Sequence, residues 1–138
     1  GVGEVGEYIR HGFSFNKFDN NLQAALKFVK YLSVTVQLYN IFDMPNIFAY
    51  AEKNNLDVNF NYLVNPTFLR LENLNSEDKT AILKHYKDKN FTNKELESAL
   101  TSSRILNQKP KFLEYTQSLD ALWGKNLMQS IPELKILV

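Results

Sequence analysis

Amide and guanidinium side chains that could bind a polar ligand recur around two short segments in which apolar and polar residues alternate. Gln37 and Asn40 stand at the end of the first segment, and Asn59 and Asn61 lie within the second. Arg10 lies near the start, between two glycines. These groups donate or accept hydrogen bonds or attract an anion, but none is a nucleophile or a general base at neutral pH. We therefore predict binding chemistry for these five residues and assign no catalytic residue and no metal ligand.

The opening glycines Gly1, Gly3 and Gly6 follow the spacing G-x-G-x-x-G, which cradles a pyrophosphate in dinucleotide-binding folds. That use requires a strand that leads into the first glycine and a helix that starts at the last one. No residue stands before Gly1, and Gly12 soon follows Gly6. We interpret the spacing as coincidental and predict a flexible loop here, with no helix of useful length.

The composition restricts the class of protein. The 138 residues suit one domain with a modest core, and 16 basic residues balance 15 acidic ones. No basic patch favours nucleic acid or an anionic membrane, and no apolar run is long enough to span a bilayer. The absence of cysteine fits a reducing compartment, so we expect a cytoplasmic location. A glycine in place of an initiator methionine suggests a truncated fragment.

Hydrophobic periodicity predicts the elements that position the polar side chains. The first half alternates in type: a helix at 15–32 after an N-cap at Ser14, a strand at 33–39, a helix from Asp43 to Asn54, and a strand at 56–64. Pro45 suits the first turn of the second helix, and Asn54 can end it. Because a helix connects the two strands, they should run parallel.

Each predicted strand has one apolar and one polar face. Thr35 and Gln37 share the polar face of the first strand, and Asn59 and Asn61 that of the second. Strands buried between two layers of helices are apolar on both faces, so this pattern indicates either a ligand-lined interior or a sheet with one solvated face. Asn40 follows the first strand, where parallel folds bind ligands; the alternative is that it caps the loop.

The second half is predicted to be helical. Residues 67–74 could form a short third strand or an extended segment. Helices are expected from Ser76, from a capping box at Thr92 and from Pro110, with a stop at Gly124 and an apolar tail that packs back on the body. The predicted fold class is α/β, with two or three mainly parallel strands in residues 1–75 and a helical extension in residues 76–138.

The first 75 residues resemble the middle-to-late barrel of radical S-adenosylmethionine (SAM) enzymes with SPASM or twitch extensions. In that family, a strand ending in Ser-x-Asp-Gly runs into a loop with a basic residue, and an asparagine follows the next strand. Arg10 in YIRHG and Asn40 in TVQLYNIFDMPNI match these features. The ending SLDALWGKNLMQSIPEL is also similar to that of some members.

The resemblance implies a helix-rich fragment of a partial (β/α) barrel. The parent enzyme would cleave SAM reductively at a [4Fe-4S] cluster and abstract hydrogen from a peptide or small metabolite. Five residues would line the SAM and substrate wall: Arg10, Gln37, Asn40, Asn59 and Asn61.

The cluster cysteines would lie in an N-terminal half of the barrel that is missing here, so this chain alone should hold no cofactor and be inactive. Its unpaired strand edge should make it a homodimer. Two alternatives stay open. The chain could be a small, self-contained α/β binding or interaction module, or a fragment of another barrel enzyme, such as a phosphate-binding one.

Overall fold

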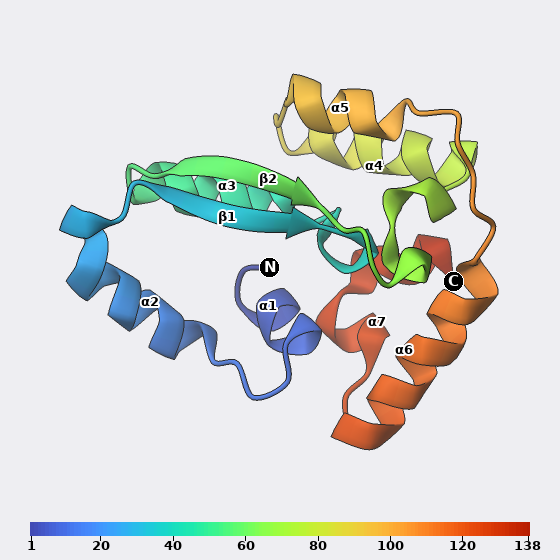
Figure 1. Cartoon of the computed structure of the whole chain (residues 1–138), viewed down its shortest axis with the longest axis horizontal. Helices are drawn as coiled ribbons and strands as arrows, with labels where there is room; N and C mark the ends of the chain where they lie inside the picture. Colours follow the sequence, from blue (N-terminus) through green and yellow to red (C-terminus); the bar gives the residue numbers. More distant parts are fainter.

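A computed structural model describes residues 1–138 and shows a two-stranded sheet with helices packed on one face and at one end (Figure 1). The helices and strands are α1 (Glu4–Ile9), α2 (Phe15–Ala25), β1 (Tyr31–Val36), α3 (Met44–Lys53), β2 (Asp57–Tyr62), α4 (Ser76–Asp88), α5 (Lys94–Leu100), α6 (Lys109–Trp123) and α7 (Leu127–Ser130). Short 3₁₀ segments occupy Leu26–Phe28, Leu38–Asn40, Thr67–Leu69, Leu71–Asn73 and Pro132–Leu137. The fold is mixed α/β, as predicted.

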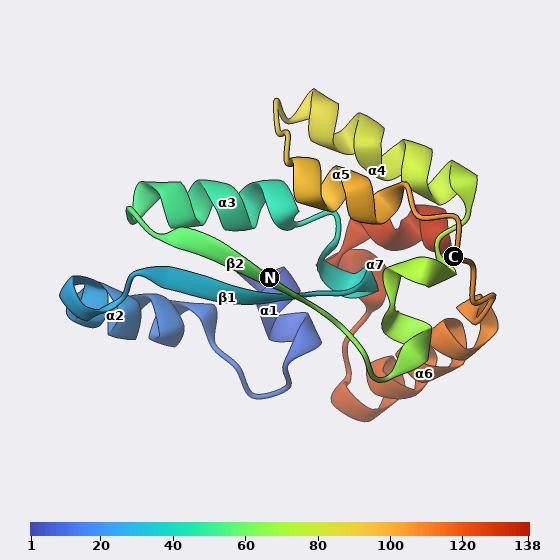
Figure 2. The ribbon, with the colours of Figure 1, turned by 45° about the horizontal axis from the view of Figure 1, so that its top comes forward.

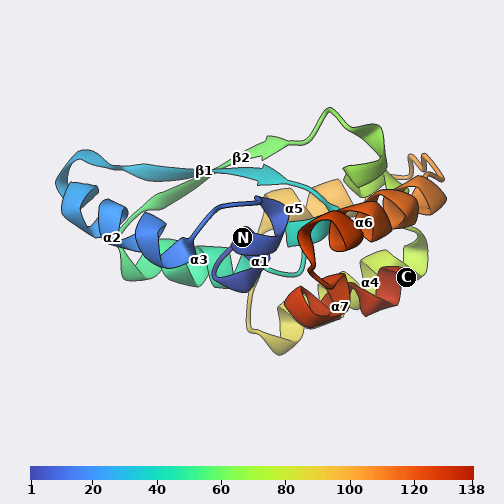
Figure 3. The same cartoon turned by 90° about the horizontal axis from the view of Figure 1, so that it is seen from below.

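The two strands run parallel, which confirms the prediction from their helical connection. Tyr31 lies opposite Asp57, and Val36 lies opposite Tyr62. Val34 and Val36 of β1 are buried with Ile47 of α3 in the main core. The opposite face carries exposed polar side chains: Ser33, Thr35, Asn59 and Asn61. Figure 3 shows α2 and α3 on one side of the sheet and no helix over the other, so the sheet has one solvated face.

The first long helix is shorter than the sequence predicted. Ser14 caps it as expected, since its hydroxyl accepts from the backbone N–H of Lys17. The helix ends at Ala25, however, and β1 already begins at Tyr31. The backbone N–H of Asp57 donates to the carbonyl of Lys30 at 3.0 Å. Strand pairing thus takes over residues whose apolar spacing also fits a helix.

Residues 4–9 form α1, so the prediction of a flexible loop is wrong. The third glycine lies inside this helix, and not at its start as a phosphate-binding loop would require. Tyr8 is buried, and its hydroxyl donates to Asp120 of α6 at 2.9 Å. A helix of six residues is marginal alone, so this long-range contact stabilises it.

The second half packs at the end of the sheet where both strands terminate. Figure 2 shows α4 and α5 side by side there, with α6 and α7 beside them. The predicted start at Ser76 and the stop at Gly124 are confirmed, and α6 begins at Lys109, one residue before the predicted start at Pro110. The tail packs back on the body, since Ile131, Leu134 and Leu137 are buried. One large core cluster includes buried residues from both halves of the chain.

Two further local predictions need correction. Residues 67–74 form two 3₁₀ segments instead of a third strand, and Asn73 holds them together through bonds to the carbonyls of Thr67 and Arg70. The cap of α5 is Asn93 and not Thr92, because the Asn93 side chain accepts from the N–H of Leu96 at 3.0 Å. No helix in the structure is both long and apolar enough to cross a membrane.

Candidate functional site

Two cavities and one open polar face lie around the sheet. The first cavity, here called the edge cavity, has a volume of about 230 Å³ and lies between β1 and the pair α1 and α2. The second, the rim cavity, has a volume of about 440 Å³ and lies between the C-terminal ends of the strands and the α4–α5 pair. The polar face is defined by Ser33, Thr35, Asn59 and Asn61.

Three of the five predicted site residues gather around the edge cavity. Arg10 reaches it from the end of α1, and Gln37 and Asn40 from the turn after β1. The aromatic rings of Phe13, Phe15 and Phe18 line the same space. Asn59 and Asn61 do not belong to this cavity but lie on the polar face. The predicted residues thus form two neighbouring groups and not one.

Asn40 is buried, with 3% of its surface exposed. Its Nδ2 donates to the carbonyl of Thr35 at 2.8 Å, and its Oδ1 accepts from the N–H of Gln37 at 3.0 Å. This carboxamide makes the bonds that a neighbouring parallel strand would make to these two residues. Asn40 therefore closes the end of the β1 edge, in agreement with the alternative that it caps the loop.

The rest of the β1 edge faces away from β2. The carbonyls of Lys30 and Val36 accept from β2 and its continuation, at Asp57 and Leu63. In a parallel pair, alternate residues bond to the same neighbour, so Ser33 and Thr35 direct their backbone groups to the other side. Both residues line the edge cavity. The N–H and C=O of Ser33 and the N–H of Thr35 are thus presented to a further partner.

The polar face offers amide groups to solvent. Asn61 donates from Nδ2 to the hydroxyl of Ser33 at 2.9 Å, across the two strands. Asn59 is exposed and makes no side-chain hydrogen bond within the chain. Arg10 is also exposed and pairs with no acid; its guanidinium lies 5.7 Å from the ring centre of Phe13. These groups can donate to a ligand without breaking an internal bond.

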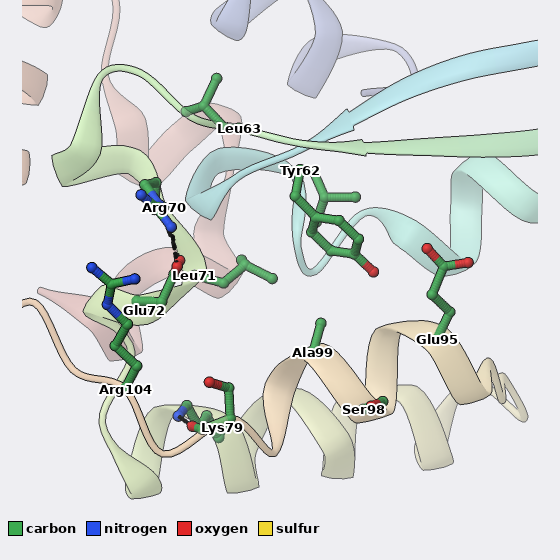
Figure 4. Close-up of a pocket in the computed structure, with 12 residues that line it drawn as sticks. Tyr62, Leu63, Arg70, Leu71, Glu72, Lys79, Glu95, Ser98, Ala99 and Arg104 are labelled. Carbon is green, nitrogen blue, oxygen red and sulfur yellow. Dashed lines mark hydrogen bonds and ion pairs between the residues drawn. The ribbon is translucent and has the colours of Figure 1, made fainter.

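The rim cavity contains charged residues that the sequence did not single out. Figure 4 shows Arg70, Lys79 and Arg104 toward one end and Glu95 toward the other. Burial alone would raise the pKa of Glu72, but the hydrogen bond and positive charge of Arg70, with a smaller effect of the charge of Arg104, hold this pKa below its usual value. No spacing in the sequence signals this group, because its cations come from three separate segments.

Tyr62 completes the rim cavity at the end of β2. Its ring lies above the cavity in Figure 4, with its hydroxyl on the side of Glu95. Burial, and then the negative charge of Glu95, raise the pKa of Tyr62. The hydroxyl therefore stays protonated at neutral pH and remains a hydrogen-bond donor.

Comparisons with known proteins give no basis for assigning a function, so the assignment depends on the geometry of the site. Neither protein-family models, nor curated protein sequences, nor solved structures gave a match to this chain. No three His, Cys, Asp or Glu side chains come together as metal ligands.

Proposed function

We propose that this chain is part of a radical SAM enzyme and supplies a section of the wall that binds SAM and substrate. The observation that carries the proposal is the sheet: two parallel, helix-connected strands with α3 on the apolar face and an open polar face. In a (β/α) barrel the helices lie outside, so the uncovered face is the interior one. A polar interior face suits a barrel that holds a ligand instead of a filled core.

The free edge of β1 supports a larger parent barrel. Consecutive strands of such a barrel are neighbours, so the strand before β1 would lie on the side opposite β2. That side presents the unpaired backbone groups of Ser33 and Thr35. Asn40 satisfies only the carbonyl of Thr35 and the N–H of Gln37 at the end of this edge. An upstream strand of three or four residues would complete the pairing.

The residues present fit SAM but not the cluster. A [4Fe-4S] cluster needs thiolate ligands, and the chain has no cysteine, so the ligands would belong to the other half of the barrel. Arg10 would bind the SAM carboxylate, and Asn59 and Asn61 would donate to or accept from its polar groups. When bound, SAM supplies, on one-electron reduction, the radical that takes a hydrogen atom from the substrate. Gln37 would add an amide contact at the wall, while Asn40 holds the turn that positions Gln37.

A second candidate function is a self-contained α/β binding module without catalysis. The observation that favours it is the main hydrophobic core of 21 buried residues, which joins side chains of both halves of the chain. A chain with its own core and with the edge and rim cavities could bind a ligand unaided. The two functions differ in one respect that can be tested: only the first requires a cluster-binding segment elsewhere in the same polypeptide.

The decisive experiment is to sequence the DNA upstream of the Gly1 codon and express the longer reading frame anaerobically. We expect an in-frame C-x-x-x-C-x-x-C motif, a reconstituted cluster, and release of 5′-deoxyadenosine from SAM. An in-frame start codon with no such motif between it and Gly1 would overturn the proposal in favour of the binding module.

In the longer protein, Asn59→Ala tests the wall itself. Loss of one ligand hydrogen bond of roughly 0.5–1.5 kcal/mol should raise the Kd for SAM by up to about tenfold. Asn20→Ala, at an exposed asparagine of α2 that is not part of the polar face, is the matched control and should leave the Kd unchanged. Equal Kd values for Asn59→Ala and the parent would remove Asn59 from the proposed wall.

A further inference from the structure

We propose that the rim cavity binds a small amphoteric ligand, with an oxyanion at one end and an ammonium group at the other. The inference goes beyond the proposed function, because the rim cavity contains none of the residues assigned to the SAM wall. Every group involved belongs to this chain. It rests on the size and place of the cavity and on the separation of charge within it.

The size and place of the cavity suit a small molecule. Its volume of about 440 Å³ lies within the range of ligand sites, roughly 300–1,000 Å³. Val36, Tyr62 and Leu63 bring the C-terminal ends of both strands to it, which is where parallel α/β folds bind ligands. Leu71 and Ala99 make its middle apolar.

The cation end has more positive than negative charge. Arg70 and Glu72 form an ion pair and largely neutralise each other. Lys79 donates from Nζ to the carbonyl of Ser102 at 2.6 Å, a bond that holds the ammonium in place but leaves its charge uncompensated. Arg104 forms no ion pair and is exposed. Lys79 and Arg104 are therefore free to bind an oxyanion, and arginine does so with paired hydrogen bonds.

The opposite end has one uncompensated carboxylate. Glu95 is exposed, pairs with no cation of the chain, and lines the cavity. Figure 4 shows Ala99, Leu71 and Tyr62 between it and the cations. A ligand with a single negative charge would leave Glu95 unused, and a long dianion would be repelled by it. Complementary charge at both ends selects an oxyanion joined to an ammonium group through an apolar spacer.

The test uses this chain and three probes of equal length: ε-aminocaproate, caproate and hexylamine. Each is titrated into ¹⁵N-labelled protein at low salt, and backbone amide shifts are followed. We expect saturable shifts for ε-aminocaproate at residues 70–72 and 95–104, with a Kd about threefold or more below that of either single-charge probe, as exposed ion pairs allow.

Two variants and two controls test which end of the rim cavity binds the ammonium group and which end binds the carboxylate. Glu95→Gln should abolish the preference for ε-aminocaproate over caproate. Arg104→Gln should raise the Kd of both of these carboxylate probes by about threefold or more. Glu52→Gln and Lys111→Gln, exposed residues outside the cavity, should change neither. Absence of saturable shifts, shifts confined to other residues, equal affinity for the three probes, or an unchanged preference in Glu95→Gln would each overturn the inference.

Discussion

At the scale of single residues, Asn40 shows how one side chain can replace part of a strand. Its carboxamide satisfies one carbonyl and one N–H at the end of the β1 edge, and it is buried while doing so. Buried polar groups that lose their partner destabilise the folded state by about 1–3 kcal/mol. Asn40 is therefore first of all a structural residue, and any effect on a ligand would follow from the turn that it holds.

The substitution Asn40→Ala should lower the free energy of unfolding by about 1–3 kcal/mol, since the carbonyl of Thr35 and the N–H of Gln37 both lose their partner. Urea denaturation followed by circular dichroism measures the change. Asn61→Ala is the control: its exposed bond to Ser33 should contribute less than about 0.5 kcal/mol. Equal effects of the two substitutions would contradict the structural role of Asn40.

Buried tyrosines should make the fold sensitive to alkali. Burial raises the pKa of Tyr39 and Tyr86, whose hydroxyls bond to Thr116 and to the carbonyl of Ile41. An unfolded tyrosine ionises at about pH 10, so above that pH the unfolded state loses protons that the folded state keeps. Each of these tyrosines then lowers the free energy of unfolding by about 1.4 kcal/mol per pH unit, and below about pH 10 its contribution is constant.

The measurement is urea unfolding between about pH 9 and pH 11.5, with tyrosinate absorbance recorded in parallel. In Tyr86→Phe the slope above pH 10 should be smaller by about 1.4 kcal/mol per pH unit. Tyr31→Phe, at an exposed position, should leave the slope as it is. A stability that does not fall above pH 10 in the parent protein would show that these hydroxyls ionise in the folded state.

At the scale of elements, the end of α6 depends on backbone conformation. Gly124 has a φ of 62°, in the left-handed region, and its N–H bonds to the carbonyl of Asp120. A Cβ at this position would meet no atom within 4 Å, so the cost of a side chain is conformational only. The termination of α6 positions α7 and the buried tail.

We expect Gly124→Ala to lower the free energy of unfolding by about 1 kcal/mol, the cost of the left-handed conformation for a residue with a Cβ. Gly124→Asn should cost less, because asparagine tolerates this conformation. Thermal unfolding of the three proteins under identical conditions gives the order. An alanine variant as stable as the parent would mean that α6 ends in another way.

At the scale of the whole molecule, the open β1 edge should drive self-association of the isolated chain. The strand has no charged residue and no proline, the usual protections against edge pairing. We expect a homodimer at micromolar concentration, with the two edges paired across a two-fold axis. Size exclusion with light scattering measures the mass, and a species that stays at 16.0 kDa on concentration would contradict the prediction.

A charge on the edge provides the matched variant. Thr35→Lys places an ammonium group at an exposed position of β1, where it disfavours pairing with a second strand. It should shift the equilibrium to the monomer, whereas Thr80→Lys, at an exposed position of α4, should not. If both variants remain dimeric, the contact lies elsewhere on the surface.

The sequence by itself determined the alternation of strand, helix and strand and the parallel pairing that follows from it. It also determined the caps at Ser14 and Gly124 and the polar face of the sheet. Each of these features depends on residues that are close together in the sequence, so hydrophobic periodicity and cap residues are enough to predict it. Arg10, Gln37 and Asn40 were predicted as site residues from their positions beside the first strand and from the family resemblance, and the fold places them around one cavity.

Only the tertiary structure decided which of these groups are free. α1 formed because Tyr8 reaches Asp120, 112 residues away, and tertiary packing buries Asn40 although its own hydrogen bonds are local. The rim cavity unites Lys79 and Arg104 across a helix hairpin and a loop. Such contacts join positions far apart in the chain, and local hydrophobic patterns contain no information about which distant partner a side chain will meet.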